Sequence, residues 1–113
     1  MIEKILMDYL QSNIDVPVYM EKPSMFPGEY ILIEKTGSGL NDRIESAMVA
    51  IQSYSGSMTG AVELNERMKS VMLDAAELDE IGSCRLNSDY NFTDTSTKEY
   101  RYQAVFNITY YGG

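Results

Sequence analysis

The stretch that decides the fold is the closing one, Tyr100-Arg101-Tyr102-Gln103-Ala104-Val105-Phe106-Asn107-Ile108-Thr109-Tyr110-Tyr111. Every second residue from Tyr100 to Tyr110 is apolar or aromatic, and the residues between them are mostly polar. This period of two is typical of a strand with one face on a core and the other toward water. At about 3.3 Å per residue the stretch extends about 40 Å, whereas a compact chain of this length has a diameter of about 34 Å. We therefore expect the strand to bend, to be interrupted, or to project toward another subunit.

A second long strand is predicted from Arg43 to Ser55, where apolar residues again alternate. Before it, Tyr30-Ile31-Leu32-Ile33-Glu34-Lys35 is apolar enough for a strand that is covered on both faces. The residues between these two strands, Thr36 to Asp42, include two glycines and are expected to form a flexible loop. Gly37-Ser38-Gly39 lacks the Lys-Ser/Thr pair of a phosphate-binding loop, and we interpret it as the tip of a hairpin.

Two helices are predicted from apolar residues that recur every three or four positions. The first covers residues 2–12. The second begins after Ser57 or Thr59, either of which can cap it, and reaches to about Glu80, where Gly82 ends it.

Two further strands complete the predicted order. Residues 16–20 form one of them, and Pro17 places it at the start or edge of the sheet because proline donates no backbone hydrogen bond. Residues 84–92 form the other, and a turn at residues 93–97 leads into the closing strand. The order helix, three strands, helix, two strands predicts an α+β fold. We expect a single domain of residues 1–113, with a mostly antiparallel or mixed sheet of about five strands and two helices packed on one face.

The chain is acidic, since its 113 residues carry 9 Lys and Arg against 17 Asp and Glu, a net charge of −8. Nucleic-acid affinity depends largely on neutralisation of phosphates by Lys and Arg, so sequence-specific binding of DNA or RNA is not expected. The sequence has no apolar run long enough for a transmembrane helix. Its charged N-terminal stretch does not resemble a signal peptide. We therefore expect no membrane partner.

Residue types that carry catalysis or bind metals are scarce. The sequence has no histidine, which removes the commonest general base and metal ligand. The single cysteine, Cys84, lies in a predicted strand, and we interpret it as a packed or interface thiol. The acidic residues Asp74, Glu77, Asp79 and Glu80 lack the spacing of a calcium loop, and we interpret them as a solvated helix face. We expect no enzymatic activity, no catalytic or metal site and no cofactor.

The order of the segments resembles a known family. A small acidic chain opens with an amphipathic helix (Ile2 to Leu10) and a strand that has early prolines (Val16 to Pro23). The Tyr30-Ile31-Leu32-Ile33 strand, a glycine-containing hairpin and a long central helix follow. The chain closes with Asp94-Thr95-Ser96-Thr97-Lys98-Glu99-Tyr100-Arg101-Tyr102-Gln103-Ala104-Val105-Phe106-Asn107-Ile108-Thr109-Tyr110-Tyr111. This architecture and closing pattern resemble the tail terminator and related minor capsid or tail-completion proteins of long-tailed bacteriophages and prophages.

The resemblance implies a structural role in virion assembly. Tail terminators are similar to one another in forming a hexameric ring that caps the finished tail tube, stops its polymerisation and presents the surface that joins the head. The implied partners are further copies of the chain, the tail tube protein and a head–tail connector or neck protein, while DNA passes through the ring without being read. The implied location is the host bacterial cytoplasm during assembly and then the head–tail junction of the virion. In a silent prophage the protein would not be made. Two alternatives remain: another neck, stopper or minor capsid protein, and a small enzyme or regulator.

Subunit contacts are assigned from physical arguments, because no residue set of the family transfers position by position. The two long strands exceed the expected domain, so their ends and the hairpin tip are expected to meet another subunit. Acidic side chains at the end of a helix oppose its dipole, and a basic partner surface would relieve that cost. The predicted contact residues are Gly37, Ser38, Gly39, Leu40, Asn41, Asp42, Arg43, Tyr54, Asp79, Glu80, Tyr110 and Tyr111.

Overall fold

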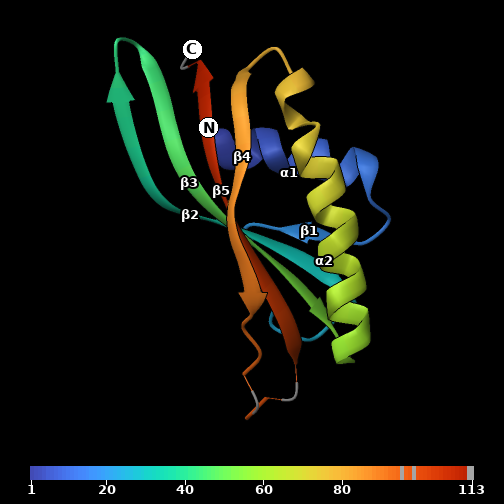
Figure 1. The fold of residues 1–113 in the computed structure, drawn as a ribbon. Coiled ribbons are helices and arrows are strands. Elements are labelled where there is room, and N and C mark those ends of the chain that lie inside the picture. Colours follow the sequence, from blue (N-terminus) through green and yellow to red (C-terminus); the bar gives the residue numbers. More distant parts are fainter. Residues whose placement is uncertain (95, 98, 112–113) are drawn as a thin grey trace.

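A five-stranded mixed sheet runs the length of the molecule, and two helices cover one of its faces (Figure 1). The computed structural model describes residues 1–94, 96–97 and 99–111, apart from the side chain of Asn41. The elements along the chain are α1 (Ile2–Asn13), β1 (Val18–Tyr19), β2 (Tyr30–Asn41), β3 (Ile44–Ser55), α2 (Met58–Leu73), the 3-10 helix η1 (Ala75–Glu77), β4 (Ile81–Asn91) and β5 (Tyr100–Tyr111). The predicted α+β fold and its order of elements are confirmed.

The strands lie in the order β1-β2-β3-β5-β4. β1 pairs with β2 in parallel, and all other neighbours are antiparallel. Pro17 precedes β1, and its carbonyl oxygen accepts a hydrogen bond from the Ile31 N–H at 2.9 Å. The edge position predicted from Pro17 is therefore confirmed, although β1 is shorter than the predicted strand at residues 16–20.

The closing strand β5 has the predicted bounds and runs without interruption. It pairs with β3 along its whole length, from Tyr100 opposite Ser55 to Tyr111 opposite Ile44. Two uninterrupted strands of this length require an elongated molecule, whose extents are 44 × 24 × 23 Å.

The main core lies between the helices and the sheet. Ser57 caps α2, because its side-chain oxygen accepts a hydrogen bond from the Gly60 N–H at 3.0 Å. The buried side chains of this core come from one stripe of each helix and from alternate positions of the central strands, as the sequence pattern predicts. They include Ile2, Leu6 and Leu10 of α1, Leu64, Met68 and Met72 of α2, Val49 and Ile51 of β3, and Ala104, Phe106 and Ile108 of β5.

A smaller aromatic cluster covers the other face of the sheet at the start of β2. The rings of Tyr30 and Tyr54 stack with centroids 4.3 Å apart, and Phe26 and Tyr19 meet Tyr30 edge-on. This cluster explains why residues 30–33 are buried on both faces, as predicted.

The prediction of a flexible loop from Thr36 to Asp42 was wrong. β2 continues to Asn41, and its pairing with β3 shifts register once, between Lys35 and Gly37. The ladder of backbone hydrogen bonds to β3 compensates for the weak strand preference of the two glycines. The tip of the hairpin therefore lies at residues 42–43 and not at Gly37-Ser38-Gly39.

The prediction that the second helix extends to Glu80 was also wrong. α2 ends at Leu73, and Asp74 donates its N–H to Val71 at 3.1 Å, which tightens the last turn. Ala75 is fully buried, so the apolar stripe continues although the α-helix has stopped. Gly82, predicted to end the helix, belongs to β4.

Candidate functional site

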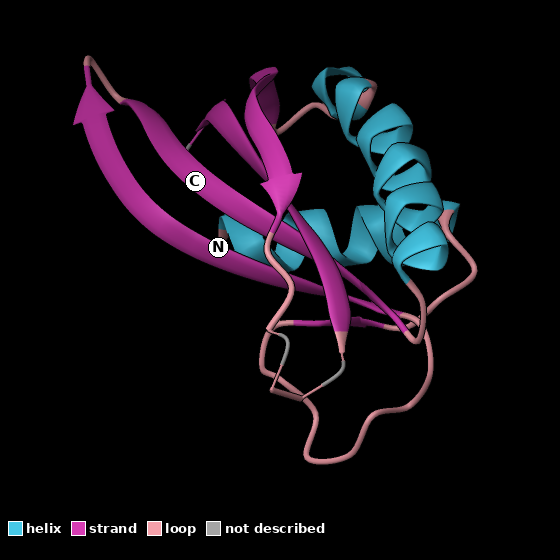
Figure 2. Cartoon of the chain, turned by 60° about the horizontal axis from the view of Figure 1, so that its bottom comes forward, coloured by secondary structure: helices cyan, strands magenta, loops and turns pink. Residues whose placement is uncertain are grey.

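The β2–β3 hairpin projects beyond the helices, and Figure 2 shows it on the side of the molecule away from α2. We call its outer part, residues 37–48, the arm. Six of the predicted contact residues are exposed in the arm: Gly37, Ser38, Gly39, Leu40, Asp42 and Arg43. A seventh, Asn41, ends β2.

The arm ends in a tight turn with an unfavourable backbone. Asp42 and Arg43 have φ values of 50° and 69°, and Asn41 pairs directly with Ile44. A two-residue hairpin turn with both central residues at positive φ prefers glycine at its second position, because a Cβ atom is disfavoured there. This chain has arginine at that position.

Large apolar side chains are exposed on the arm and beside it. Leu40 is 72% exposed, and Ile44 and Met48 are 44% and 42% exposed. Tyr111, which lies opposite Ile44 on β5, is 57% exposed. Such a concentration of exposed apolar side chains in one segment is typical of a surface that meets another protein.

The outer edge of β2 is open along the arm. β1 pairs only with Ile31 and Leu32, so in the described part of the chain no strand covers that edge beyond them. The unpaired N–H and C=O groups of an edge strand can bind a further strand of another chain.

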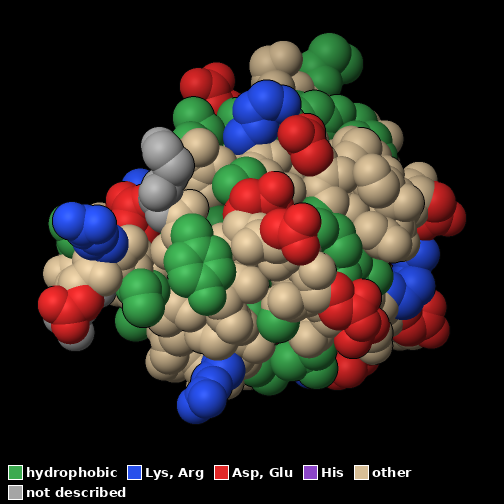
Figure 3. Space-filling model, turned by 90° about the horizontal axis from the view of Figure 1, so that it is seen from above, with side chains coloured by type: hydrophobic (Ala, Val, Ile, Leu, Met, Phe, Trp, Pro, Cys, Tyr) green, Lys and Arg blue, Asp and Glu red, His purple; other side chains and the backbone are tan. Residues whose placement is uncertain are grey.

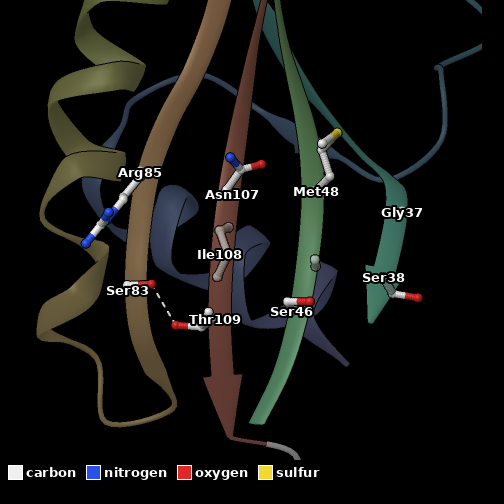
Figure 4. A pocket seen from close by; sticks show the side chains of 10 residues that line it. Gly37, Ser38, Ser46, Met48, Ser83, Arg85, Asn107, Ile108 and Thr109 are labelled. Atoms are coloured by element: carbon white, nitrogen blue, oxygen red, sulfur yellow. Dashed lines mark hydrogen bonds between the residues drawn. The ribbon is translucent and has the colours of Figure 1, made fainter. Parts of the chain in front are cut away.

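A shallow groove of about 610 Å³ crosses the sheet at the base of the arm (Figure 4). Ser83 and Thr109 are joined in it by a hydrogen bond of 2.6 Å between their hydroxyl oxygens. Hydroxyl and amide groups of this kind can hydrogen-bond to a partner's backbone, but the groove has no paired acid and base for catalysis. It is lined by Gly37, Ser38, Ser46, Ala47, Met48, Ser83, Arg85, Asn107, Ile108 and Thr109.

Only Gly37 and Ser38 of these lining residues were among the predicted contact residues; the other eight, which include Met48, Arg85 and Asn107, were not. Met48 and Asn107 pair directly, as do Arg85 and Asn107, so three neighbouring strands bring them together. The sequence could have indicated these three residues only through alternation, because they occupy the positions of their strands that face away from the main core. The register between the strands was not available from the sequence.

The predicted residues Asp79 and Glu80 lie at the same end of the molecule as the end of β5. Both are exposed, and the Glu80 carbonyl oxygen accepts a hydrogen bond from the Tyr111 N–H at 3.0 Å. They occupy the turn between η1 and β4 and not the end of α2, so the helix-dipole argument for them does not apply. Figure 3 looks down on this end and shows Asp and Glu side chains gathered over it, with hydrophobic side chains between them.

A second groove, of about 460 Å³, lies between α1 and this turn. The half-buried side chains of Ile5, Tyr9 and Leu78 line it, together with the polar side chains of Asp8, Ser12 and Glu80. The Tyr9 hydroxyl donates to the Val71 carbonyl at 2.8 Å. Burial, and then the nearby carboxylates of Asp74 and Glu77, raise the pKa of Tyr9. This groove therefore combines half-buried apolar side chains with two acidic ones, Asp8 and Glu80.

Two predicted contact residues belong to the interior. Tyr54 is 1% exposed, and its hydroxyl donates to Gln52 at 2.7 Å and accepts from Arg101 at 2.8 Å. Tyr110 is 8% exposed and packs in the main core. The alternation of side chains along a strand places Tyr110 in the main core and Tyr54 in the aromatic cluster on the other face. Neither side chain is therefore available to another subunit.

Cys84 is a poor nucleophile in this fold. It packs in the main core on β4, and burial raises the pKa of its thiol to about 11. A thiol with that pKa is protonated near neutral pH, whereas catalytic cysteines react as thiolates. Within the described residues no group of three or more Cys, Asp or Glu side chains is arranged to hold a metal ion. No helix among them has the length and apolarity to cross a membrane.

Comparison with known proteins gives a match in structure only. No protein-family model and no curated protein sequence matches this chain. The fold is similar to that of a chain in the solved structure "Virion of native gene transfer agent (GTA) particle". The TM-score is 0.65 with 12% sequence identity, and the match covers 96% of this chain and 85% of that chain. The chain therefore has the fold of a component of that particle.

Proposed function

We propose that this chain is a structural protein of a phage-like virion, acting through residues 1–113 as a single domain. The observation that carries the proposal is the similarity of nearly the whole fold to a chain of a gene transfer agent virion. The exposed apolar arm and the open edge of β2 support an assembly role, because both are features of surfaces that bind other protein chains.

Within that class, we propose the finer role of tail terminator. In this role the chain forms a ring, hexameric as the resemblance implies, on the end of the tail tube. The ring stops tube polymerisation and binds the connector or neck protein, and DNA passes through its lumen. A net charge of −8 suits such a lumen, because a mostly acidic surface does not retain DNA. Assembly would take place in the bacterial cytoplasm, and the finished protein would lie at the head–tail junction.

Deletion of the gene in the phage or prophage that encodes it tests this role. Without a terminator, tube polymerisation continues, so electron micrographs should show tails that are longer and more variable in length. Expression of the intact chain from a plasmid should restore uniform tails. Tails of normal length in the deletion strain would rule out the terminator role.

The same experiment separates the alternatives. A neck or stopper protein would leave tails of normal length that are not joined to filled heads. A small enzyme or regulator would leave the particles themselves unchanged.

A further inference from the structure

We propose that the open outer edge of β2 in one copy pairs with the open outer edge of β4 in a second copy, so that the sheet continues from one chain into the next. The proposal rests on the proposed function, since it names the contact by which copies associate. Three features carry it: the two free edges, the register of the strands and the charges along each edge.

Both edge strands of the sheet have free backbone groups. β1 covers β2 only as far as Leu32, so in the described part of the chain the outer side of β2 is unpaired from Ile33 to Asn41. β4 pairs with β5, and no described strand lies on its other side. The Ile31 N–H donates outward to the Pro17 carbonyl oxygen at 2.9 Å, and alternate residues of a strand direct their backbone groups to the same side. The backbone groups of Ile33 therefore face the open edge, where a strand of another chain can satisfy them.

The strand directions suit this pairing. β2, β3, β5 and β4 are joined by three antiparallel pairings, so β2 and β4 run in opposite directions. A second copy placed beside β4 in the same orientation therefore presents its β2 antiparallel to that strand. A chain cannot pair its own two edges, because β3 and β5 lie between them. The contact joins two different surfaces of identical chains, and such a heterologous contact produces a ring when the rotation closes.

Residues of β2 and β4 share rows across the sheet. Through their partners in β3 and β5, Glu34 lies in the row of Ser88, and Gly37 lies in the row of Arg85. Figure 4 shows the row of Gly37 and Arg85 crossing all four strands. Residues of one row point to the same face of the sheet. A second copy placed beside the first, with no shift along the strands, therefore pairs each of these residues with its row partner on the other copy.

The bulges of the two edge strands lie at the same level of the sheet. The pairing of β2 shifts between Lys35 and Gly37, and that of β4 shifts between Leu86 and Ser88. Lys35 lies in the row of Leu86, so the two bulges are neighbours. Because each strand gains one residue in this region, the inward and outward positions on either side of the bulges stay matched between the two edges.

The charges of the two edges are complementary on both faces of the sheet. On the face away from the helices, Glu34 comes one row from Arg85 of the second copy. On the helix face, Lys35 comes one row from Asp89, which already accepts from Lys69. Diagonal neighbours on one face are about 7–8 Å apart, which long charged side chains span. Glu34, Lys35 and Arg85 form no ion pair with other described residues, so all three can pair with another copy.

The pairing also covers the exposed leucine of the arm. Leu40 is 72% exposed and lies in the row of Ile81, on the face that carries the main core. In the continued sheet its side chain packs beside that row at the start of β4. An exposed leucine on an open edge strand favours association, because the edge then buries both its apolar side chain and its backbone groups.

Disulfide trapping tests the pairing. Glu34 and Ser88 share a row and are exposed. Opposite residues of an antiparallel pair have Cα atoms about 4.5–5.5 Å apart, a distance that a disulfide spans. Under mild oxidation, the variant with both Glu34→Cys and Ser88→Cys should form cross-linked dimers, trimers and larger products on a non-reducing gel, because each copy joins two neighbours. Each single variant alone should stay uncross-linked, and a mixture of the two should give dimers only.

The outcomes of the trapping experiment separate the possible pairings. Dimers from Glu34→Cys alone would show that β2 pairs with β2, and dimers from Ser88→Cys alone would show that β4 pairs with β4. Either result would overturn the proposal, as would a double variant that does not cross-link. The matched control combines Ser88→Cys with Glu63→Cys, at an exposed residue of α2, and should not form the series.

A charge exchange tests the side-chain contact. The variants are Glu34→Arg, Arg85→Glu and the two combined, and sedimentation velocity measures the association of the purified chains over a range of concentrations. Each single variant should weaken association roughly tenfold, because it places like charges together, and the double variant should recover most of the loss. Glu63→Arg makes the same change in net charge as Glu34→Arg and should associate like the natural chain. Equal loss with Glu63→Arg, or no recovery in the double variant, would overturn the specific pair.

Failure of this contact and failure of the terminator role are distinguishable. A natural chain that stays monomeric at its highest soluble concentration would overturn the contact, and it leaves the terminator role intact if the deletion strain makes overlong tails. Conversely, normal tails in the deletion strain would remove that role even if the copies associate through β2 and β4.

Discussion

Two residues at the tip of the arm hold backbone angles that glycine adopts at lower cost. Asp42 has φ 50° and Arg43 has φ 69°. Asp can stabilise the left-handed region through local hydrogen bonds of its short side chain, whereas Arg has no such compensation. The backbone conformation of Arg43 therefore lowers the stability of the monomer relative to a chain with glycine at this position.

Replacing Arg43 with glycine should increase the free energy of unfolding by about 1 kcal/mol, since it removes the Cβ atom from a left-handed position. Urea denaturation followed by circular dichroism measures the change. The matched control is Ser38→Gly in the strand part of the arm, which should not stabilise the protein. A loss of stability in Arg43→Gly would contradict the conformational argument.

Cys84 is the only thiol, and its burial controls its chemistry. With a pKa of about 11, its thiolate fraction at pH 8 is far smaller than that of an exposed cysteine, whose pKa is about 8.5. Alkylation by iodoacetamide at pH 8 should be more than about a hundredfold slower in the native protein than in urea. Mass spectrometry of timed samples measures both rates, and equal rates would show that Cys84 is accessible.

At the scale of elements, Asp89 joins β4 to α2. Its carboxylate accepts from Lys69 at 2.8 Å and from Asn65 at 3.0 Å. Lys69 also pairs with Glu66 at 2.9 Å. These hydrogen bonds, led by that from Lys69, lower the pKa of Asp89. The edge strand β4 is thereby fixed to the helix layer by a partly buried polar contact.

The Asp89→Asn variant should lose about 1–2 kcal/mol of stability at pH 7, because it weakens two charge-assisted hydrogen bonds. Since the pKa of Asp89 is lowered by folding, its contribution is present above the ordinary Asp pKa of about 3.9 and is lost as the pH falls through the lowered value. The stability difference between the two proteins should therefore be constant from pH 7 to pH 5 and shrink below about pH 4.

The control for this experiment is the exposed pair of Lys4 and Asp8 on α1. Asp8→Asn should change stability by less than about 0.5 kcal/mol, because exposed ion pairs contribute little. Urea denaturation at several pH values measures both variants. An equal loss in the two variants would mean that the Asp89 contact is no stronger than a surface pair.

At the scale of the whole molecule, the arm extends past the region that the helices cover. The chain measures 44 Å along its long axis and about half as much in the other directions. Apolar residues on such an extension contribute little to the stability of the monomer and are available for assembly.

The Leu40→Ser variant should change the free energy of unfolding by less than about 0.5 kcal/mol, because Leu40 is 72% exposed. It should weaken self-association roughly tenfold, because the leucine side chain would be buried in the contact between copies. The control is Met25→Ser, at an 80% exposed residue of the loop before β2. Equal association of the Leu40→Ser variant and the natural chain would show that the arm tip is not an apolar contact.

The alternation of residues predicted much of the fold. It gave the bounds of β5 from Tyr100 to Tyr111 and the inward positions Phe106 and Ile108, because side chains of a strand must alternate between its faces. The edge position of β1 followed from Pro17 and not from alternation, because a missing N–H restricts where a strand can pair. These are properties of the local chain, and they do not depend on which segments become neighbours.

The tertiary structure decided the features that depend on neighbouring segments. β2 continues through Gly37 and Gly39 although the local sequence favours a loop, because pairing with β3 supplies backbone hydrogen bonds to this segment. The core takes Tyr54 inside and leaves Leu40 outside, since burial depends on which layer lies over each residue. The candidate site likewise depends on which strands become neighbours in the sheet. By itself the sequence determined the order of the elements and their inward faces, through local geometry. The ends of β2 and α2, the arm and the grooves were decided by the tertiary structure, because sheet order and register bring distant residues together at one end of the molecule.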